Sequence, residues 1–384
     1  MIRRTAGCNG FMYTSSAVSS DSSAIDDATR PRCPLPHHEP KSWTLLRHAD
    51  VSRALLDPAT FSSAVSAHLA VPSGIDPPEH TDYRLIIDQY FSPERMTAVE
   101  PKLRTIAVEM VAALPAHGEV EFISQVAESF ALRAQCAFLG WPVELHEPLR
   151  QWTHRNRAAT RARDRAAMAA VALEFDRHIR EVLDARRHSN ETDVASQLLR
   201  EKIRDRHLTD EEIVSILRNW TVGELATIAA CIGILAHFMA AVIPIQSQLR
   251  VDPALLPAAI DEILRIHAPL RSSRRVTTAP LDFDGRTLAA GERVTLDWAA
   301  ANRDERAFDR PLQFRLDRDP NLNLLYGAGI HVCPGAPLAR MELRVFMEEL
   351  LARTELAFAP GRKPVEASYP ASGFASCPLQ VRKR

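Results

Sequence analysis

The stretch of sequence that decides the fold is Leu325-Tyr-Gly-Ala-Gly-Ile-His-Val-Cys-Pro-Gly-Ala-Pro-Leu-Ala-Arg340. It is a glycine-rich loop that presents one cysteine, Cys333, just before a predicted helix. Glycines permit the tight backbone that a loop needs in order to approach a flat ligand. The positive end of the following helix and nearby backbone N–H groups favour the thiolate over the thiol. The alternative interpretation is a small buried cysteine, the usual role of an isolated cysteine.

This segment resembles the haem-binding signature of the cytochromes P450, F-G-x-G-x-H/R-x-C-x-G followed by x-x-L-A-R. The matching residues are Gly327, Gly329, His331, Cys333, Gly335, Leu338, Ala339 and Arg340. Tyr326 stands in place of the phenylalanine, which keeps an aromatic ring near the sulfur but adds a hydroxyl. The resemblance implies that Cys333 is the metal ligand of haem b. It also implies that Tyr326, Gly327, His331 and Gly335 contact the cofactor. A thiolate ligand donates electron density to iron and assists O–O cleavage.

A second motif, Glu262-Ile-Leu-Arg265, places an acid and a base three residues apart on one helical face. As a local helix pair it would contribute only about 0.2–0.5 kcal/mol. In the cytochromes P450 this Glu-x-x-Arg pair is joined by an arginine ahead of the haem loop, and Arg318 stands at the matching place. The resemblance therefore implies a structural network that fixes the loop.

Two further segments match the family in the correct order. Asp76-Pro-Pro-Glu-His-Thr-Asp-Tyr-Arg84 resembles D-P-P-E-H-T-x-x-R, whose histidine and arginine approach a haem propionate, so His80 and Arg84 are assigned to the cofactor. Arg275 and the run Ala301-Asn-Arg-Asp304 resemble the segment whose arginine binds the other propionate, and His331 completes the set. Charge-assisted bonds from arginine to carboxylate suit a buried dianionic cofactor. Each residue alone is more typical of a surface or ion-paired side chain.

The oxygen-activating helix of the family usually carries A-G-x-D/E-T-T, and here the sequence departs from that pattern. The corresponding run begins Val222-Gly-Glu-Leu-Ala-Thr, so Gly223 is expected to line the haem and Thr227 to supply the catalytic hydroxyl. Ala226 takes the place of the acid. The hypothesis is that Glu224, three residues before Thr227, substitutes for it in proton delivery. The alternatives are a Thr227 hydroxyl bonded back to a helix carbonyl and a Glu224 carboxylate paired with an arginine.

Composition excludes several classes of protein. The chain has 384 residues, 46% hydrophobic, with 47 Lys plus Arg against 48 Asp plus Glu, so it lacks the basic excess usual for a nucleic-acid partner. Six scattered cysteines with no C-x-x-C pair indicate neither a structural zinc site nor a disulfide framework. A reducing cytoplasm fits this cysteine usage best.

The predicted fold is mainly α with a minor β region, the cytochrome P450 fold with a long central helix over the haem. Residues 1–38 are predicted to be a polar, Ser-rich, poorly ordered leader, and residues 39–384 a single domain. A short strand at Trp43 and a helix from Ala49 open the domain. The other expected elements are helices over Glu100–Leu139 (broken near Pro115–Gly118), Leu149–Arg187 (as a pair), Thr209 onward, Pro257–His267 and Ala336–Thr354, with strands over Arg274–Val294 and Ser368–Val381.

One segment has the length of a membrane span. Leu225–Ile245 contains 21 residues without a formal charge. It continues a charged helix, however, and lacks flanking aromatic belts or clustered basic loops. We therefore expect a helix buried inside a globular protein, and no membrane partner.

The expected activity is a monooxygenase that uses O2 and electrons to oxidise a small organic substrate. A separate ferredoxin and ferredoxin reductase would donate the electrons, and Arg340 and Arg344 would meet an acidic donor. Ala226 keeps open a peroxide-driven peroxygenase, and a non-catalytic haem protein that senses a ligand is the third alternative. The arginines of Leu149–Arg187 suggest either attraction of an anionic substrate or, more simply, a solvated helix face. The sequence does not identify the substrate.

Overall fold

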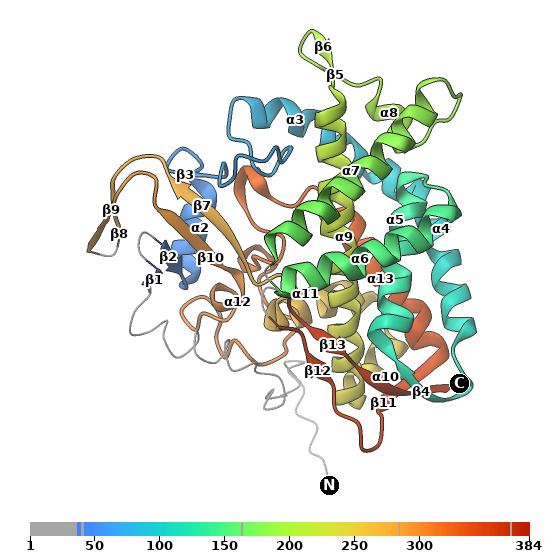
Figure 1. The fold of residues 1–384 in the computed structure, drawn as a ribbon. Coiled ribbons are helices and arrows are strands. Elements are labelled where there is room, and N and C mark those ends of the chain that lie inside the picture. Colours follow the sequence, from blue (N-terminus) through green and yellow to red (C-terminus); the bar gives the residue numbers. More distant parts are fainter. Residues whose placement is uncertain (1–36, 40–41, 163, 284, 369–370) are drawn as a thin grey trace.

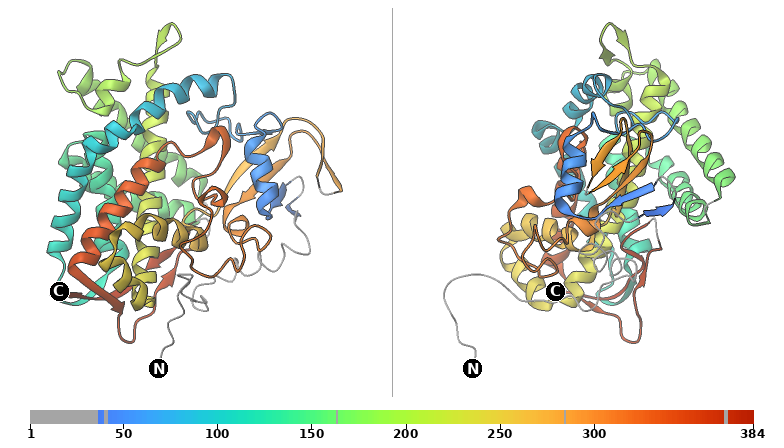
Figure 2. Two further views of the ribbon diagram at one scale, coloured as in Figure 1. Left: turned by 180° about the vertical axis from the view of Figure 1, so that it is seen from behind. Right: turned by 90° about the vertical axis from the view of Figure 1, so that its left-hand side faces the viewer.

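Helices form the larger part of the protein, and a β-rich part lies to one side of them (Figures 1 and 2). The computed structural model describes residues 37–39, 42–162, 164–283, 285–368 and 371–384. The predicted leader, residues 1–38, lies outside this range except for His37 and His38, which belong to the first strand.

The helical part follows the order expected from the sequence. The α-helices of the described residues are α2 (His48–Leu56), α3 (Glu79–Ile87), α4 (Pro93–Ala113), α5 (Glu128–Leu139), α6 (His146–Ala162), α7 (Arg165–Arg187), α8 (Val194–Leu198), α9 (Asp210–Ala241), α10 (Ile243–Val251), α11 (Leu256–His267), α12 (Trp298–Ala301) and α13 (Ala336–Arg353). A π-helical turn, η2 (Ile123–Ala127), precedes α5. The mainly helical fold class is confirmed.

The strands form two principal sheets. They are β1 (His37–Glu39), β2 (Ser42–Leu45), β3 (Phe61–Ser62), β4 (His117–Glu121), β5 (Lys202–Ile203), β6 (Arg206–His207), β7 (Ser272–Thr277), β8 (Leu281–Phe283), β9 (Arg286–Leu288), β10 (Arg293–Asp297), β11 (Thr354–Phe358), β12 (Val365–Glu366), β13 (Phe374–Ser376) and β14 (Pro378–Lys383). One sheet has the order β1-β2-β10-β7-β3 and the other β11-β14-β4. Only β2 and β10 pair in parallel within them.

Long-range pairing produced the strands that the sequence did not predict. The segment expected to be only a break in a helix, Pro115–Gly118, leads into β4, which pairs with β14 at the far end of the chain. The strand β11, which also pairs with β14, was not predicted either. For β4 and β11 the partner strand rather than the local pattern decides the conformation. The β5–β6 hairpin, also not predicted, is the exception because its two-residue strands pair locally.

The long helix α9 runs through the middle of the helical part (Figure 1). Thr209 caps its start, because its hydroxyl accepts a hydrogen bond from Glu212 N–H while the Glu212 carboxylate accepts one from Thr209 N–H. It packs against α5, α7, α11 and α13. Within the described residues it alone is long and apolar enough to cross a membrane, but 67% of its most apolar window is buried.

The uncharged stretch Leu225–Ile245 is therefore part of a protein core, as expected. It is not one continuous helix, because α9 ends at Ala241 and α10 begins at Ile243 with Pro244 in its first turn. Proline is tolerated there because its missing N–H would be unsatisfied in any case. A single membrane span would need this stretch to remain helical throughout.

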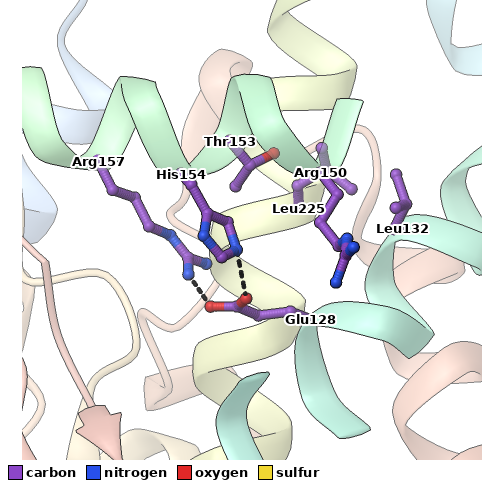
Figure 3. Close-up of a pocket in the computed structure, with 7 residues that line it drawn as sticks. All are labelled: Glu128, Leu132, Arg150, Thr153, His154, Arg157 and Leu225. Carbon is purple, nitrogen blue, oxygen red and sulfur yellow. Dashed lines mark hydrogen bonds and ion pairs between the residues drawn. The ribbon is translucent and has the colours of Figure 1, made fainter. Parts of the chain in front are cut away.

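A shallow hollow lies between α5, α6 and α9 (Figure 3). Its polar wall is formed by Glu128 on α5, which accepts hydrogen bonds from Arg157 and His154 on α6. Arg150 pairs with Glu147 and Arg155 with Glu174. These arginines of the Leu149–Arg187 segment thus have carboxylate partners within this chain, which agrees with the solvated-face interpretation. None of the residues predicted for the functional site lines this hollow.

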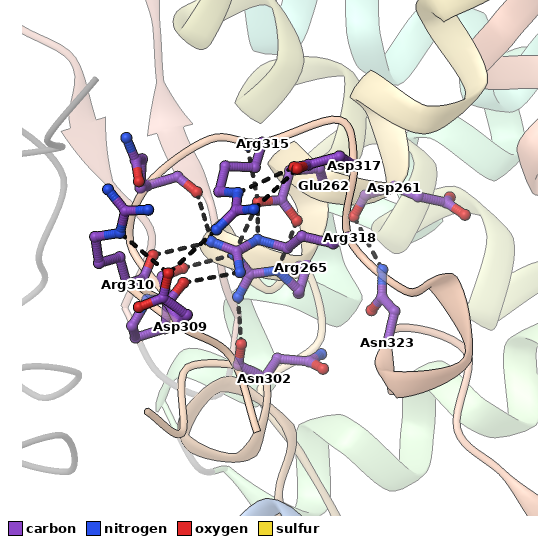
Figure 4. A network of polar contacts seen from close by, with 12 residues as sticks. Asp261, Glu262, Arg265, Asn302, Asp309, Arg310, Arg315, Asp317, Arg318 and Asn323 are labelled. Atoms are coloured by element: carbon purple, nitrogen blue, oxygen red, sulfur yellow. Dashed lines mark hydrogen bonds and ion pairs between the residues drawn. The ribbon is translucent and has the colours of Figure 1, made fainter. Parts of the chain in front are cut away.

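The predicted Glu-x-x-Arg pair and Arg318 form one buried network (Figure 4). Arg265 donates from Nε to Glu262 Oε2 over 2.7 Å and from Nη2 to Oε1 over 3.0 Å. Arg318 Nε donates to the same Oε1 over 2.8 Å. The residue exposure is 1% for Arg265 and 5% for Glu262, so these charges are stabilised by each other rather than by water.

This network fixes backbone as well as side chains. Arg265 also donates to the carbonyl oxygens of Asn302 and Pro311. Arg318 donates to the carbonyl oxygens of Asp309, Arg310 and Gln313, each over 2.9 Å. The otherwise irregular segment 302–318 is thereby tied to α11, as the sequence predicted, and the segment leads directly into the cysteine loop.

We expect Glu262→Ala to destabilise the protein by about 3–5 kcal/mol, because it leaves two buried guanidinium groups without their carboxylate. The free energy of unfolding in urea measures this loss. Glu305→Ala is the matched control, since Glu305 is exposed at the edge of the same segment and should change stability by less than about 0.5 kcal/mol. Equal effects of the two substitutions would show that the network does not stabilise the fold.

Candidate functional site at the cysteine loop

The backbone of the cysteine loop is held in a conformation that requires glycine. Gly327 and Gly329 have φ angles of +74° and +68°, in the left-handed region. A Cβ atom on Gly329 would lie 2.5 Å from the carbonyl oxygen of Leu55 on α2, so no larger residue fits there. The N–H of Cys333 donates to the carbonyl oxygen of Tyr326 over 2.9 Å, which closes the loop ahead of α13.

Arg84 on α3 fixes the loop from the other side. Its Nη1 donates to the carbonyl oxygens of Ile330 and Val332, over 3.0 and 2.7 Å, and its Nε pairs with Asp88 over 2.8 Å. The sequence predicted Arg84 as a propionate ligand. The structure gives it a loop-holding role that the sequence did not predict, and its assignment to the propionate stays a prediction.

Three cationic or potentially cationic side chains gather beside the loop, with the carboxylate of Asp76 near them. The rings of His80 and His331 lie 4.3 Å apart between centroids, and neither Nε2 atom has a hydrogen-bond partner among the described residues. Arg275 is 8% exposed, and its Nη1 donates to the carbonyl oxygen of Arg274 over 2.8 Å. Burial lowers the pKa of all three groups, and His331 falls to about 4.

Cys333 differs from the other cysteines that the structure describes. Cys136, Cys231 and Cys377 are buried, whereas Cys333 has an exposed side chain. Protein still surrounds the sulfur on most sides, so burial raises the pKa of the thiol, although the N–H groups of Gly335 and Ala336 act in the opposite direction. Contrary to the sequence-based prediction, these N–H groups alone therefore do not stabilise the thiolate over the thiol. A coordinated metal ion would stabilise the thiolate, because it deprotonates a thiol outright.

The ring of Tyr326 is covered by Arg340. The guanidinium carbon of Arg340 is 4.4 Å from the ring centroid, and Arg340 also pairs with Asp261 over 3.1 Å. Burial raises the pKa of the Tyr326 hydroxyl well above its usual value, so it stays protonated.

The helix α9 supplies the opposite wall. Gly223 is exposed, and a Cβ atom placed on it would meet no atom within 4 Å. Thr227 is partly exposed on the next turn, and its hydroxyl makes no hydrogen bond with any described residue. Thr221, by contrast, donates to the carbonyl oxygen of Leu217 over 2.8 Å. The alternative interpretation of Thr227, a hydroxyl bonded back to a helix carbonyl, is therefore wrong for Thr227. Thr221 makes such a bond instead.

Glu224 does not pair with an arginine, which was its alternative role. Its Oε1 is buried without a hydrogen-bond partner in the described part of the chain. Burial raises the pKa of Glu224, whereas Glu342 on α13, a fully buried carboxyl that the sequence analysis did not single out, acts on it in the opposite direction. The sequence feature that could have pointed to Glu342 is an acidic residue on the apolar face of the last helix, between Met341 and Leu343.

The residues gathered here fit a haem. Its propionates would give His80 Nε2 and His331 Nε2 the acceptors that the described residues do not provide, and the buried guanidinium of Arg275 carries a charge that suits a propionate. The open space at Gly223 would admit a flat ring next to α9, and Cys333 would bind the iron through its sulfur.

The predicted donor-docking arginines are engaged within the chain. Arg340 is paired with Asp261, and Arg344 with Glu100 and Glu348 over 2.7 and 3.0 Å. Their charge is locally balanced, which weakens the attraction for an acidic partner that the sequence suggested.

Comparisons with known proteins identify the family. The family model of cytochrome P450 matches residues 137–381. Vitamin D(3) 25-hydroxylase of Pseudonocardia autotrophica is 32% identical over 341 residues, which cover 83% of this chain and 82% of that protein. Cyclomarin C epoxidase of Salinispora arenicola is 29% identical, with 81% of this chain and 83% of the epoxidase covered.

Solved structures give the same result. The ligand-free structure of cytochrome P450 TbtJ1 superposes with a TM-score of 0.86 at 28% identity, over 94% of this chain and 97% of that one. A mutant of P450 EryK in complex with erythromycin B gives 0.85 at 26% identity, over 94% and 96%. The chain therefore belongs to the cytochrome P450 family, the haem-thiolate monooxygenases.

Proposed function

We propose that this protein uses O2 and two electrons to insert one oxygen atom into a small organic substrate, with haem b bound through Cys333. The observation that carries the proposal is the exposed Cys333 side chain, at the end of a loop that Arg84 and the glycine turn hold in place. In the overall reaction substrate, O2, two electrons and two protons yield the oxygenated product and water. The bound haem supplies the oxygen-activating chemistry.

The protein's own groups hold the cofactor and deliver protons. His80, His331 and Arg275 would hold the propionates, and Arg84 keeps the loop in register. Gly335 lies beside the sulfur, Tyr326 and Gly327 would contact the cofactor from the same loop, and Gly223 would let the ring approach α9. The Thr227 hydroxyl passes protons to the oxygen side, and Glu224 substitutes for the acid missing at Ala226.

The electron donors are a separate ferredoxin and ferredoxin reductase, working in the cytoplasm, and residues 39–384 act as one catalytic domain. The relatives include a hydroxylase and an epoxidase of organic molecules, which supports the same substrate class here. The peroxide-driven peroxygenase remains the second candidate because Ala226 removes the usual acid.

A first test uses the reduced carbonyl spectrum and the oxidant requirement together. The haem-loaded protein should show the thiolate type of spectrum, and Cys333→Ala should lose it, while Cys377→Ala, at a buried cysteine, should keep it. Candidate substrates are those that shift the ferric spectrum. Product should form with NADPH, ferredoxin and reductase. Turnover with peroxide alone and none with the reductase system would favour the peroxygenase.

A second test concerns Thr227. We expect Thr227→Ala to lower the product formed per electron consumed by on the order of 10²-fold, because a positioned proton-transfer group contributes about that much. Thr227→Ser should restore most of it. Thr221→Ala is the control, since that hydroxyl is bonded to a helix carbonyl. If Thr227→Ala and Thr221→Ala couple electrons to product equally well, Thr227 has no catalytic role.

A further inference from the structure

We propose that Trp220 and Tyr90 form an electron relay that reduces the haem after peroxide has oxidised it in the absence of substrate. The inference rests on the part of the proposed function that binds haem through Cys333. It adds a second activity, the one-electron reduction of the oxidised cofactor by an external reductant. Excess peroxide oxidises a thiolate irreversibly, so such a relay would protect the sulfur ligand as well as the haem.

A set of ring contacts leads away from the cysteine loop. A Cβ atom placed on Gly335 would lie 3.9 Å from Cys333 Sγ and 3.8 Å from Phe91 Cε1, so the sulfur and the Phe91 ring flank the same glycine. The Phe91 ring meets Trp220 edge-on, with centroids 5.1 Å apart. The ring of Tyr90 lies 5.4 Å from that of Trp220. These separations are typical of aromatic rings in contact, so packed rings join Tyr90 to the loop.

The relay residues come from two elements that the fold brings together. Tyr90 and Phe91 lie on η1 (Asp88–Phe91), the 3-10 turn after α3, and Trp220 lies on α9. Trp220 is three residues before Gly223, so the two share the helix face that we assign to the haem. Phe138 on α5 packs against Trp220 and Phe91 and completes an aromatic cluster.

The indole of Trp220 is suited to carry a positive charge without keeping it. Its Nε1 atom is buried and has no hydrogen-bond acceptor among the described residues. An indole N–H can only donate, so an oxidised indole without an acceptor keeps its proton and remains a radical cation. A buried cation is costly, and the charge therefore moves on to a group that can release a proton.

Tyr90 has the acceptor that Trp220 lacks. Its side chain is buried, and its hydroxyl donates to Glu201 Oε1 over 3.1 Å. Oxidation of Tyr90 moves the phenol proton to Glu201 and leaves a neutral tyrosyl radical beside a neutral carboxyl. Burial raises the pKa of the Tyr90 hydroxyl, so the proton stays on the phenol until the ring is oxidised. Glu201 is partly exposed, which places this end of the relay near solvent.

Tyr326, in the cysteine loop itself, does not offer the same exit. The guanidinium of Arg340 lies 4.4 Å from the Tyr326 centroid. The guanidinium of Arg95 lies 4.6 Å from the Tyr90 centroid. Each cation repels a positive charge on its ring, so either tyrosine is oxidised only if its proton leaves. The Tyr326 hydroxyl makes no hydrogen bond with any residue that the structure describes, whereas the Tyr90 hydroxyl has Glu201.

Two electrons restore the haem after each molecule of peroxide. Hydrogen peroxide oxidises the ferric haem by two electrons and releases one water. In each of two steps an electron passes from Trp220 to the haem, Tyr90 replaces it, and the Tyr90 proton goes to Glu201. A one-electron reductant such as ascorbate then reduces the tyrosyl radical, and Glu201 returns the proton. Two protons from solvent complete the second water at the haem.

Electron paramagnetic resonance of the haem-loaded protein, mixed with hydrogen peroxide without substrate and rapidly frozen, tests the relay. We expect a tyrosyl radical whose hyperfine structure narrows when the tyrosines are ring-deuterated. Tyr90→Phe should lose the tyrosyl signal and leave a tryptophanyl one, and Trp220→Phe should lose both. In both variants peroxide should bleach the haem absorption faster, because the oxidising equivalents stay at the cofactor.

Two substitutions outside the relay are matched controls. Tyr83→Phe removes a buried tyrosine that also donates to a carboxylate, that of Glu212. Trp141→Phe removes a buried tryptophan whose Nε1 likewise lacks a partner among the described residues and whose ring packs on Phe175. Neither should alter the radical or the bleaching. A radical that Tyr90→Phe and Trp220→Phe leave unchanged, or that the controls change equally, overturns the relay.

The reduced carbonyl spectrum separates this inference from the proposed function. A thiolate-type spectrum together with a radical that the variants leave unchanged keeps the haem assignment and overturns the relay. A protein that binds no haem overturns both. The expected radicals in a protein that makes no product with either oxidant would sink the monooxygenase proposal and support the relay.

Discussion

The conformation of the loop that ends at Cys333 is the constraint on which the rest of the structure depends. The loop has few large side chains to pack, so it is held through its backbone. Arg84 donates hydrogen bonds to the carbonyl oxygens of Ile330 and Val332. Gly329 lies so close to the carbonyl of Leu55 that a side chain at position 329 would not fit. These contacts come from α2 and α3, far from the loop in sequence. The sulfur is therefore positioned only when the whole protein has folded.

The buried polar groups around this loop fall into two sets. Glu262 has two arginines and needs nothing further, so that network acts as a rigid support. The Nε2 atoms of His80 and His331 lack partners among the described residues, which is the arrangement expected around an anionic cofactor. The first set supports the loop, and the second is where we expect a cofactor to be held.

The change in the oxygen-activating helix follows from helix geometry. Moving the acid from position 226 to position 224 turns its side chain by roughly 200° around the helix axis. An acid at 226 would therefore leave the helix on a different side from Glu224. Glu224 is near Thr227 in the chain, and its Oε1 is buried without a partner among the described residues.

The sequence by itself determined the family, the order of the helices and the Glu262–Arg265–Arg318 network, and it predicts Cys333 as the iron ligand. These depend on motifs in which the residue type and its spacing already specify the chemistry. It could not determine β4, the pairing of α6 arginines with Glu128 and Glu174, or the role of Arg84. A strand needs a partner, and a charged side chain takes its role from its neighbours. Only the tertiary structure decides what lies opposite residues separated by more than a hundred positions, so the partners of β4 and Arg84 were decided by the fold.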